Sequence, residues 1–234
     1  MTPPGAVRVV LLDIEGTTTP IAFVHERLFG YARSHLPAYV TTHWNDQPVR
    51  DVIHQLNNEG VREGRRAITD PDSLLSVVRD LMDQDRKSSG LKTLQGLIWE
   101  DGYQAGDLRG EVWDDVPVAL RRWRNEGREI AIYSSGSELA QRRLFESTAA
   151  GDLTPLITAF FDTRVGAKIE ADSYTRIARS LGHPAPSILF VSDVTAELHA
   201  ARAAGLEVVL SVRPGNAPQP DAHLFPAVST LTGI

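Results

Sequence analysis

Four short apolar segments, each running directly into polar residues, constrain the fold of this chain more than any other feature. They are Val7 to Leu12, Glu129 to Tyr133, Ser187 to Val191 and Leu206 to Val212. Nearly continuous hydrophobicity and many β-branched residues are typical of strands that are buried on both faces of a sheet. We therefore predict a parallel sheet at the centre of the protein.

Helical periodicity fills the sequence between the later strands. Apolar residues recur at helical spacing over 116–123, 174–181 and 194–201, and Gly182 and Gly205 stand where a helix commonly ends. Alternating strands and helices predict an α/β fold with a doubly wound, mostly parallel sheet and helices on both faces. Ligands of such folds bind at the carboxyl ends of the strands, where the polar residues lie.

One long stretch, from about residue 20 to residue 110, interrupts this alternation. It carries helix-like patterns over 26–39, 47–59, 71–85 and 90–105 and no convincing strand. We interpret it as a helical insertion after the first strand. The predicted domains are an α/β catalytic core of residues 1–19 and 111–234 and a helical cap domain of residues 20–110.

Composition excludes several classes of function. With no cysteine, the chain cannot form disulfides, use thiol catalysis or bind metals through thiolates. A net charge of −6 argues against sequence-independent binding of nucleic acid. No apolar run exceeds four residues, which predicts no membrane partner, and we expect a cytoplasmic protein.

Two carboxylates follow the first predicted strand, at Asp13 and Glu15. In nearly extended backbone, residues two apart point the same way, so both can face one site. Such a pair suits a division of labour between an ionised nucleophile and a proton carrier. The alternative interpretation is a polar turn without catalytic function.

Three serines and a glycine, Ser134 to Ser137, follow the second predicted strand. Hydroxyl and backbone N–H groups beside a helix start can hold an anion. The alternative is that Ser137 caps the next helix and Gly136 forms a turn. A nucleophilic serine is disfavoured, because Ala131 and Ile132 precede the serines and the G-x-S-x-G pattern is absent.

Asp193 and Glu197 follow the third predicted strand. Lys168 lies in the chain between the serines at 134–137 and these two acids. Two acids at the edge of a sheet that already carries Asp13 suit a Mg²⁺ ion. Alternatively, Asp193 caps a helix and Glu197 interacts with its dipole. A single lysine is usually a solvated surface residue.

Together the four signals are more specific than any one alone. An aspartate, a serine, a lysine and a terminal acidic motif, in this chain order, resemble the haloacid dehalogenase superfamily of phosphotransferases. Glu15 stands where that superfamily usually has a second aspartate, and the sequence resembles its enolase-phosphatase family. The segments that carry this resemblance are DIEGTTTPI, LQGLIWEDGYQAGDLRGEVWDDVPVAL, IYSSGS, FFDTRVGAK, SDVTAE and VRPGNAP.

The resemblance implies a Mg²⁺-dependent enzyme of methionine salvage that enolises a small phosphorylated methylthio-diketone and then removes its phosphate. It implies that Asp13 is the nucleophile, that Asp13, Asp193 and the main-chain carbonyl of Glu15 hold Mg²⁺, and that Ser134, Ser135 and Lys168 bind the substrate. Mg²⁺ and Lys168 would offset the repulsion between Asp13 and an anionic phosphate.

Several roles stay open at the level of the sequence. The carboxylate of Glu15 is the candidate base for enolisation, although a residue of the insertion could also serve, and the role of Glu197 is not assigned. The insertion would close over the site, where Phe23, Trp99 and Tyr103 either contact the methylthio tail or pack in the core. We expect a monomer.

Two other functions fit part of the pattern. A phosphatase of the same superfamily would act on a small phosphorylated metabolite without enolising it. A signalling receiver domain also phosphorylates an aspartate on a doubly wound sheet. Its usual length, about half that of this chain, and its acceptor after a later strand both oppose that interpretation.

Overall fold

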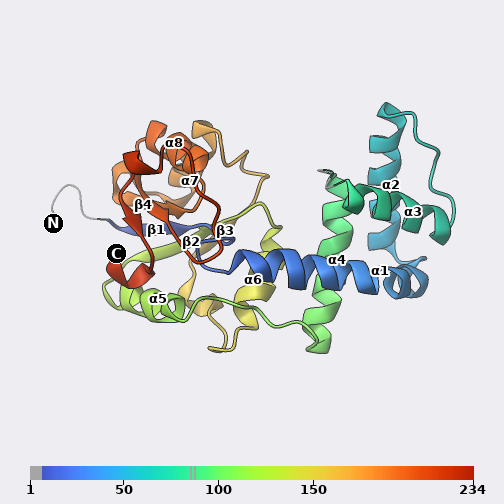
Figure 1. Ribbon diagram of the computed structural model, residues 1–234, viewed down its shortest axis with the longest axis horizontal. Coiled ribbons are helices and arrows are strands. Elements are labelled where there is room, and N and C mark those ends of the chain that lie inside the picture. The colour runs from blue at the N-terminus through green and yellow to red at the C-terminus, as the bar shows by residue number, and fades with distance from the viewer. Residues whose placement is uncertain (1–6, 85, 87) are drawn as a thin grey trace. The chain divides into compact units, whose positions relative to one another are not determined.

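The computed structural model describes residues 7–84, 86 and 88–234, which divide into two compact units (Figure 1). The α/β unit comprises the chain up to Val24 together with Arg109–Ile234, and the helical unit comprises His25–Leu108. The predicted catalytic, metal and phosphate-binding residues all belong to the α/β unit, whereas the tail candidates Trp99 and Tyr103 belong to the helical unit.

A sheet of parallel strands forms the centre of the α/β unit, in the order β3-β2-β1-β4-β5-β6. The strands are β1 (Val9–Leu12), β2 (Glu129–Tyr133), β3 (Ala159–Phe161), β4 (Ile188–Ser192), β5 (Glu207–Ser211) and β6 (Ala227–Val228). The predicted doubly wound parallel sheet is confirmed. The order of its strands reverses between β1 and β4, and ligands bind at such a switch point.

The register of the central strands explains where the site forms. Leu12, the last residue of β1, pairs with Ile132 of β2 on one side and with Val191 of β4 on the other. The residues that follow these strands therefore emerge at the same edge. All four residues of β1 are fully buried, as its apolar sequence predicts for a central strand.

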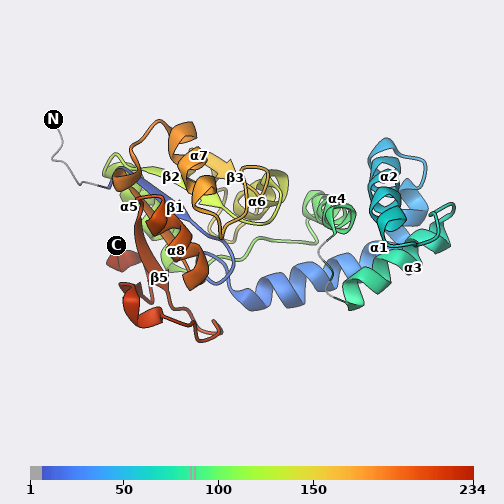
Figure 2. The same ribbon diagram turned by 90° about the horizontal axis from the view of Figure 1, so that it is seen from above.

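Helices cover both faces of the sheet, with α7 and α8 on one face and α5 on the other (Figures 1 and 2). Their bounds are α5 (Asp115–Asn125), α6 (Glu138–Glu146), α7 (Ala171–Leu181) and α8 (Thr195–Ala203). Val9 and Leu11 of β1 pack in one cluster with Tyr174, Ile177 and Leu198. Short 3₁₀ turns span Thr154–Leu156, Ala185–Ser187, Ala222–Leu224 and Leu231–Gly233.

The helical unit begins in a π-helical turn, Phe23–Leu28, which starts in the α/β unit. Its helices are α1 (Phe29–His43), α2 (Gln47–Arg62), α3 (Pro71–Asp83) and α4 (Ser89–Ala105). They overlap the four helical patterns of the sequence, but α1 runs over Phe29–His43 rather than 26–39 and α2 ends at Arg62 rather than at Glu59. Asp85, the predicted end of the third pattern, lies outside the described residues.

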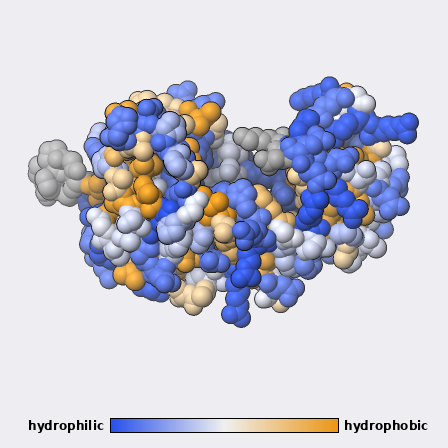
Figure 3. Space-filling model, in the orientation of Figure 1, coloured by the Kyte–Doolittle hydropathy of each residue, from blue (hydrophilic) through white to orange (hydrophobic). Residues whose placement is uncertain are grey.

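Capping and amphipathic packing explain these helices. Asp70 and Ser73 form a capping box at the start of α3, and the Ser88 side chain accepts a hydrogen bond from Leu91 N at the start of α4. Leu36, Leu56 and Leu94 are buried, and hydrophilic residues cover most of the visible surface of this unit (Figure 3). In the described part of the chain, no helix is long and apolar enough to cross a membrane.

Candidate active site

Asp13 lies directly after β1, and its carboxylate is nearly buried. Asp13 Oδ1 accepts a hydrogen bond from Ile14 N at 2.7 Å, and Thr18 Oγ1 donates to the Asp13 main-chain oxygen at 3.1 Å. The loop then turns tightly, because the N–H groups of residues 17, 18 and 19 all donate to Ile14 O. Gly16 adopts a φ of 67°, which side chains disfavour.

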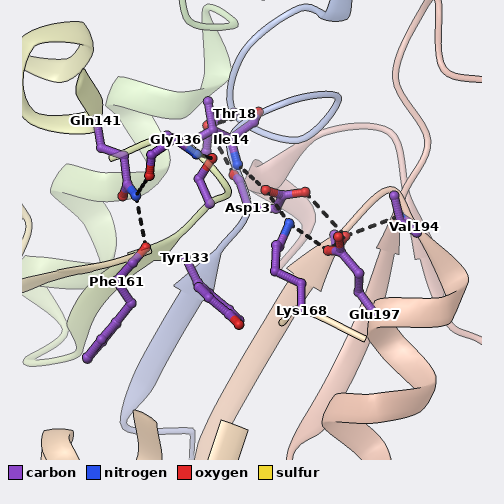
Figure 4. A network of polar contacts seen from close by, with 12 residues as sticks. Asp13, Ile14, Thr18, Tyr133, Gly136, Gln141, Phe161, Lys168, Val194 and Glu197 are labelled. Atoms are coloured by element: carbon purple, nitrogen blue, oxygen red, sulfur yellow. Dashed lines mark hydrogen bonds and ion pairs between the residues drawn. The ribbon is translucent and has the colours of Figure 1, made fainter. Parts of the chain in front are cut away.

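Lys168 lies against Asp13 and Glu197 rather than in solvent (Figure 4). Its Nζ atom is 2.7 Å from Asp13 Oδ1 and 2.6 Å from Glu197 Oε2, and its side chain is only 10% exposed. Ser192 Oγ donates to Glu197 Oε2 at 2.8 Å and lies 3.4 Å from Asp13 Oδ2. The alternative of a solvated surface lysine is therefore wrong.

Three hydroxyl groups hold the loop that carries Lys168. Tyr133 Oη donates to Gly166 O at 2.9 Å, Ser173 Oγ to Ala167 O at 2.8 Å, and Tyr174 Oη to Lys168 O at 2.6 Å. Because α7 and β2 supply these donors, the lysine is positioned by both a strand and a helix. Sequence reasoning did not find these contacts, which depend on the tertiary structure.

Burial and the close approach of several carboxylates shift the pKa values of this site. Burial, followed by the neighbouring Asp13 carboxylate, raises the pKa of Asp193 to about 7. The same two causes raise the pKa of Glu197. Burial lowers the pKa of Lys168, but Asp13 and Glu197 raise it by more, so the ammonium stays charged. Three carboxylates thus share one ammonium group.

Asp193 lies beside Gly16, at the switch point of the sheet. A Cβ atom built on Gly16 would be 2.4 Å from Asp193 Oδ2, so only glycine leaves room for this carboxylate. Val194, not Asp193, is the N-cap of α8, and the first N–H of that helix, at Thr195, donates to Gln219 Oε1 at 3.3 Å. The alternative that Asp193 serves only as a helix cap is therefore wrong.

The donor set at this edge fits a hard divalent cation. It consists of oxygen atoms, its net charge is negative, and the carboxylate of Asp193 forms no ion pair with any described residue. Among the residues that the structure describes, no three acidic or histidine side chains converge on one point as metal ligands. A cation here would therefore use two carboxylates together with main-chain oxygen atoms and water.

The three serines of the loop after β2 have different structural roles. Ser134 is buried, and its Oγ atom accepts a hydrogen bond from Gly136 N at 3.3 Å, whereas Ser135 is exposed. Ser137 caps α6 by accepting from Ala140 N at 3.2 Å, so the structural alternative holds for this serine. Ser134 and Ser135 are left with no capping function.

Gln141 is a site residue that sequence reasoning missed. Its Nε2 atom donates to Gly136 O and to Phe161 O, both at 2.8 Å, and thereby ties the serine loop to β3 (Figure 4). The side chain is 1% exposed. From the sequence, only its position one turn into α6 could have indicated that Gln141 contacts the serine loop.

Glu15 is partly buried in the tight loop, where it forms a backbone bridge with Thr19. Phe23 and Trp99 are both buried, and Trp99 Nε1 donates to Leu28 O at 2.7 Å within the helical unit. Trp99 therefore packs in the core of that unit. Burial also raises the pKa of Tyr103.

Comparisons with known proteins agree with this geometry. The profile of the haloacid dehalogenase-like hydrolases matches residues 7–205. The chain is 46% identical to a protein of Azotobacter vinelandii named enolase-phosphatase E1, over 97% of both chains. It is 43% identical to a Drosophila mojavensis protein of the same name, over 98% of this chain and 95% of that one.

A solved structure shows the same fold. The crystal structure of the UTR4 protein from Saccharomyces cerevisiae superimposes with a TM-score of 0.79 at 34% sequence identity. The match covers 96% of this chain and 98% of that one. The similarity therefore includes both the α/β unit and the helical insertion.

Proposed function

The chain belongs to the enolase-phosphatases, a family of haloacid dehalogenase-like hydrolases, and from this premise we propose its reaction. The substrate is 2,3-diketo-5-methylthiopentyl-1-phosphate, and the products are the acireductone 1,2-dihydroxy-3-keto-5-methylthiopentene and phosphate. The enzyme is thus a phosphatase of methionine salvage. The observation that carries the site assignment is the buried contact of Lys168 with Asp13, beside Asp193.

Asp13 is the nucleophile of the phosphatase step. Its Oδ1 atom already accepts from Lys168 and from Ile14 N, whereas among the described residues Oδ2 has only the 3.4 Å contact with Ser192. Oδ2 is therefore the oxygen with free lone pairs. It forms a bond to phosphorus while the bond from phosphorus to the substrate oxygen breaks, and that oxygen takes up a proton. Water then hydrolyses the phosphoaspartate.

Asp13, Asp193 and the main-chain carbonyl of Glu15 would hold Mg²⁺. When bound there, the ion neutralises charge on the phosphoryl oxygens and lets the anionic nucleophile approach. Phosphatases of this superfamily generally depend on Mg²⁺. The excess of buried carboxylates over ammonium groups supports the same need in this chain.

Lys168, Ser134 and Ser135 bind the substrate. The ammonium group of Lys168 contributes positive charge next to the nucleophile, and its loop is fixed by the Tyr133 and Tyr174 hydroxyls. The serine loop presents hydroxyl and N–H donors that can hold phosphoryl oxygens. Gln141 fixes this loop in place.

Glu15 is the base for enolisation. Its carboxylate removes a proton from the carbon next to the substrate carbonyl, and the carbonyl oxygen takes up a proton to complete the enol. Glu15→Gln should slow solvent-deuterium exchange into the substrate by about 10² to 10⁴-fold. Exchange at the parent rate would place the base elsewhere, such as in the helical unit.

The helical insertion, predicted as residues 20–110, serves as a cap that excludes water during the reaction. Phe23, Trp99 and Tyr103 are the candidates for contact with the methylthio tail. The burial of Trp99 within the helical unit favours a packing role for that residue. A monomeric state and a cytoplasmic location stay predictions.

One assay tests the proposed function. The protein is incubated with Mg²⁺ and the diketone phosphate, and released phosphate and near-UV absorbance are followed together. We expect both to rise, since the acireductone is an enediol. Phosphate release without the enediol absorbance would favour a superfamily phosphatase that does not enolise its substrate. Accumulation of a stable phosphoprotein without turnover would favour a receiver domain.

A further inference from the structure

Asn216 lies in the VRPGNAP segment after β5, and its amide group reaches the catalytic loop. Its Nδ2 atom donates to Gly16 O at 2.9 Å and to Ser211 O at 3.2 Å. Two carbonyl acceptors on one side of the amide require the nitrogen on that side, so the oxygen must face the other way. The orientation of the amide is therefore fixed by its own hydrogen bonds.

The oxygen of this amide receives no hydrogen bond from the part of the chain that the structure describes. This atom, Asn216 Oδ1, is buried. A buried carbonyl oxygen without a partner is costly, and in native proteins it usually indicates a bound water or ion. The position of Oδ1 shows what could satisfy it.

Asn216 Oδ1 and Asp193 Oδ2 lie on the same side of Gly16. A Cβ atom at Gly16 would be 3.0 Å from the first oxygen and 2.4 Å from the second. When Asp193 is ionised, as it must be to bind a cation, both atoms are acceptors and neither can satisfy the other. A hydrated cation at Asp193 would present water hydrogens to Asn216 Oδ1 and positive charge to Asp193.

The same side chain also positions the main chain of the loop. Gly16 O is held by Asn216 Nδ2 and by Ser211 Oγ, at 2.9 and 3.1 Å, while Gly16 N donates to Thr19 O at 2.9 Å. The two peptide groups around Gly16 are thereby fixed. One of them carries the Glu15 carbonyl.

We propose that Asn216 is a positioning residue of the cation site, whose Oδ1 atom accepts a hydrogen bond from water bound to the cation. The inference rests on the proposed function in that it needs a divalent cation at Asp13 and Asp193. Residues that orient metal ligands or their water typically contribute 10- to 100-fold to metal affinity.

Calorimetric titration of the full-length, metal-free chain with MgCl₂ tests this role without substrate. We expect Asn216→Ala to raise the Kd for Mg²⁺ by about tenfold or more. The matched control is Ser211→Ala, which removes the other donor to Gly16 O but leaves Asn216 Oδ1 in place, and it should raise the Kd by less than Asn216→Ala does. Circular dichroism in the presence of EDTA checks that both variants are folded.

Asn216→Ala with a Kd within twofold of the parent value, or with no larger effect than Ser211→Ala, would overturn the proposal. A parent protein that binds no Mg²⁺ would contradict the metal assignment of the proposed function as well. If Asn216→Ala does not fold, Asn216→Gln keeps both the amide donor and the amide oxygen but lengthens the side chain by one methylene group, which moves the oxygen from its place beside Asp193. We expect a Kd above that of the parent, and a Kd within twofold of the parent would overturn the proposal.

Discussion

Two buried ionic clusters in the α/β unit differ in charge. In the first, Arg213 and Asp115 form a bidentate ion pair with distances of 3.0 and 2.9 Å. Arg213 also donates to Thr17 O and Ser229 O, and Leu231 N donates to Asp115. One cation meets one anion, and main-chain groups of residues 17, 229 and 231 add further hydrogen bonds to the pair.

The second cluster, around Lys168, has three carboxylates for one ammonium group. Lys168 contacts Asp13 and Glu197, while Asp193 shares the site without an ion pair in the described chain. The neutral Arg213–Asp115 cluster needs no ligand for charge balance, and it joins residues 213, 229 and 231 near the C-terminus to α5. An unbalanced cluster is stable only with bound protons or a bound cation. The two clusters therefore differ in charge balance: the structural cluster at Arg213 is neutral, and the catalytic cluster at Lys168 has more carboxylates than ammonium groups.

Asp13→Asn should break the catalytic cluster with the largest effect on the reaction. An amide cannot attack phosphorus, so phosphate release should fall by about 10⁴-fold or more. Metal-free stability should not fall, because the change removes repulsion from Asp193 and Glu197 while Lys168 keeps its contact with Glu197. Turnover at the parent rate would contradict the phosphoaspartate.

Asp115→Ala should have the opposite effect, lowering stability rather than catalysis. It leaves the buried Arg213 guanidinium without its partner, which typically costs about 3–5 kcal/mol in free energy of unfolding. The control is Asp83→Ala at the exposed Arg33 pair, where a loss of about 0–1 kcal/mol is expected. Equal effects in urea denaturation would refute the structural role of the first cluster.

Lys168→Met keeps most of the side-chain volume and removes the charge. Loss of one positioned electrostatic group typically lowers the rate by about 10² to 10³-fold. Steady-state kinetics should show a higher KM as well as a lower kcat, because Lys168 would bind the phosphate in both ground and transition states. Parent-like kinetics would remove Lys168 from the site.

A smaller effect concerns the pH dependence of the metal-free protein. Asp193 has a pKa of about 7 when folded, against an ordinary value of 3.8. Between these two pH values, Asp193 holds a proton in the folded state that it has lost in the unfolded state. Protonation of Asp193 therefore contributes fully to the free energy of unfolding below about pH 4, and this contribution disappears as the pH rises through 7. In EDTA, the Tm should therefore fall with rising pH, and less steeply in Asp193→Asn. An identical slope in both proteins would contradict this assignment.

Some strands and site residues could be predicted from the sequence, and others could not. Strands β1, β2, β4 and β5 were visible because they are buried apolar runs, whereas β3 has three residues and β6 has two, too few for any periodicity. The resemblance indicated Asp13, Lys168 and Asp193. The pairing of Arg213 with Asp115 could not be read from one sequence, because the two residues lie 98 positions apart and only the fold brings them together.

The charge imbalance around Lys168 is tested most directly by proton release during Mg²⁺ binding. The full-length, metal-free protein is titrated with MgCl₂ by calorimetry at about pH 6 in buffers of different ionisation enthalpy, since binding to carboxylates must displace their protons. Because the pKa of Asp193 is raised to about 7, we expect Mg²⁺ binding to release protons, and Asp193→Asn to release fewer than the parent. Asp115→Asn should behave like the parent. Binding without proton release, or equal release from Asp193→Asn, would contradict the account.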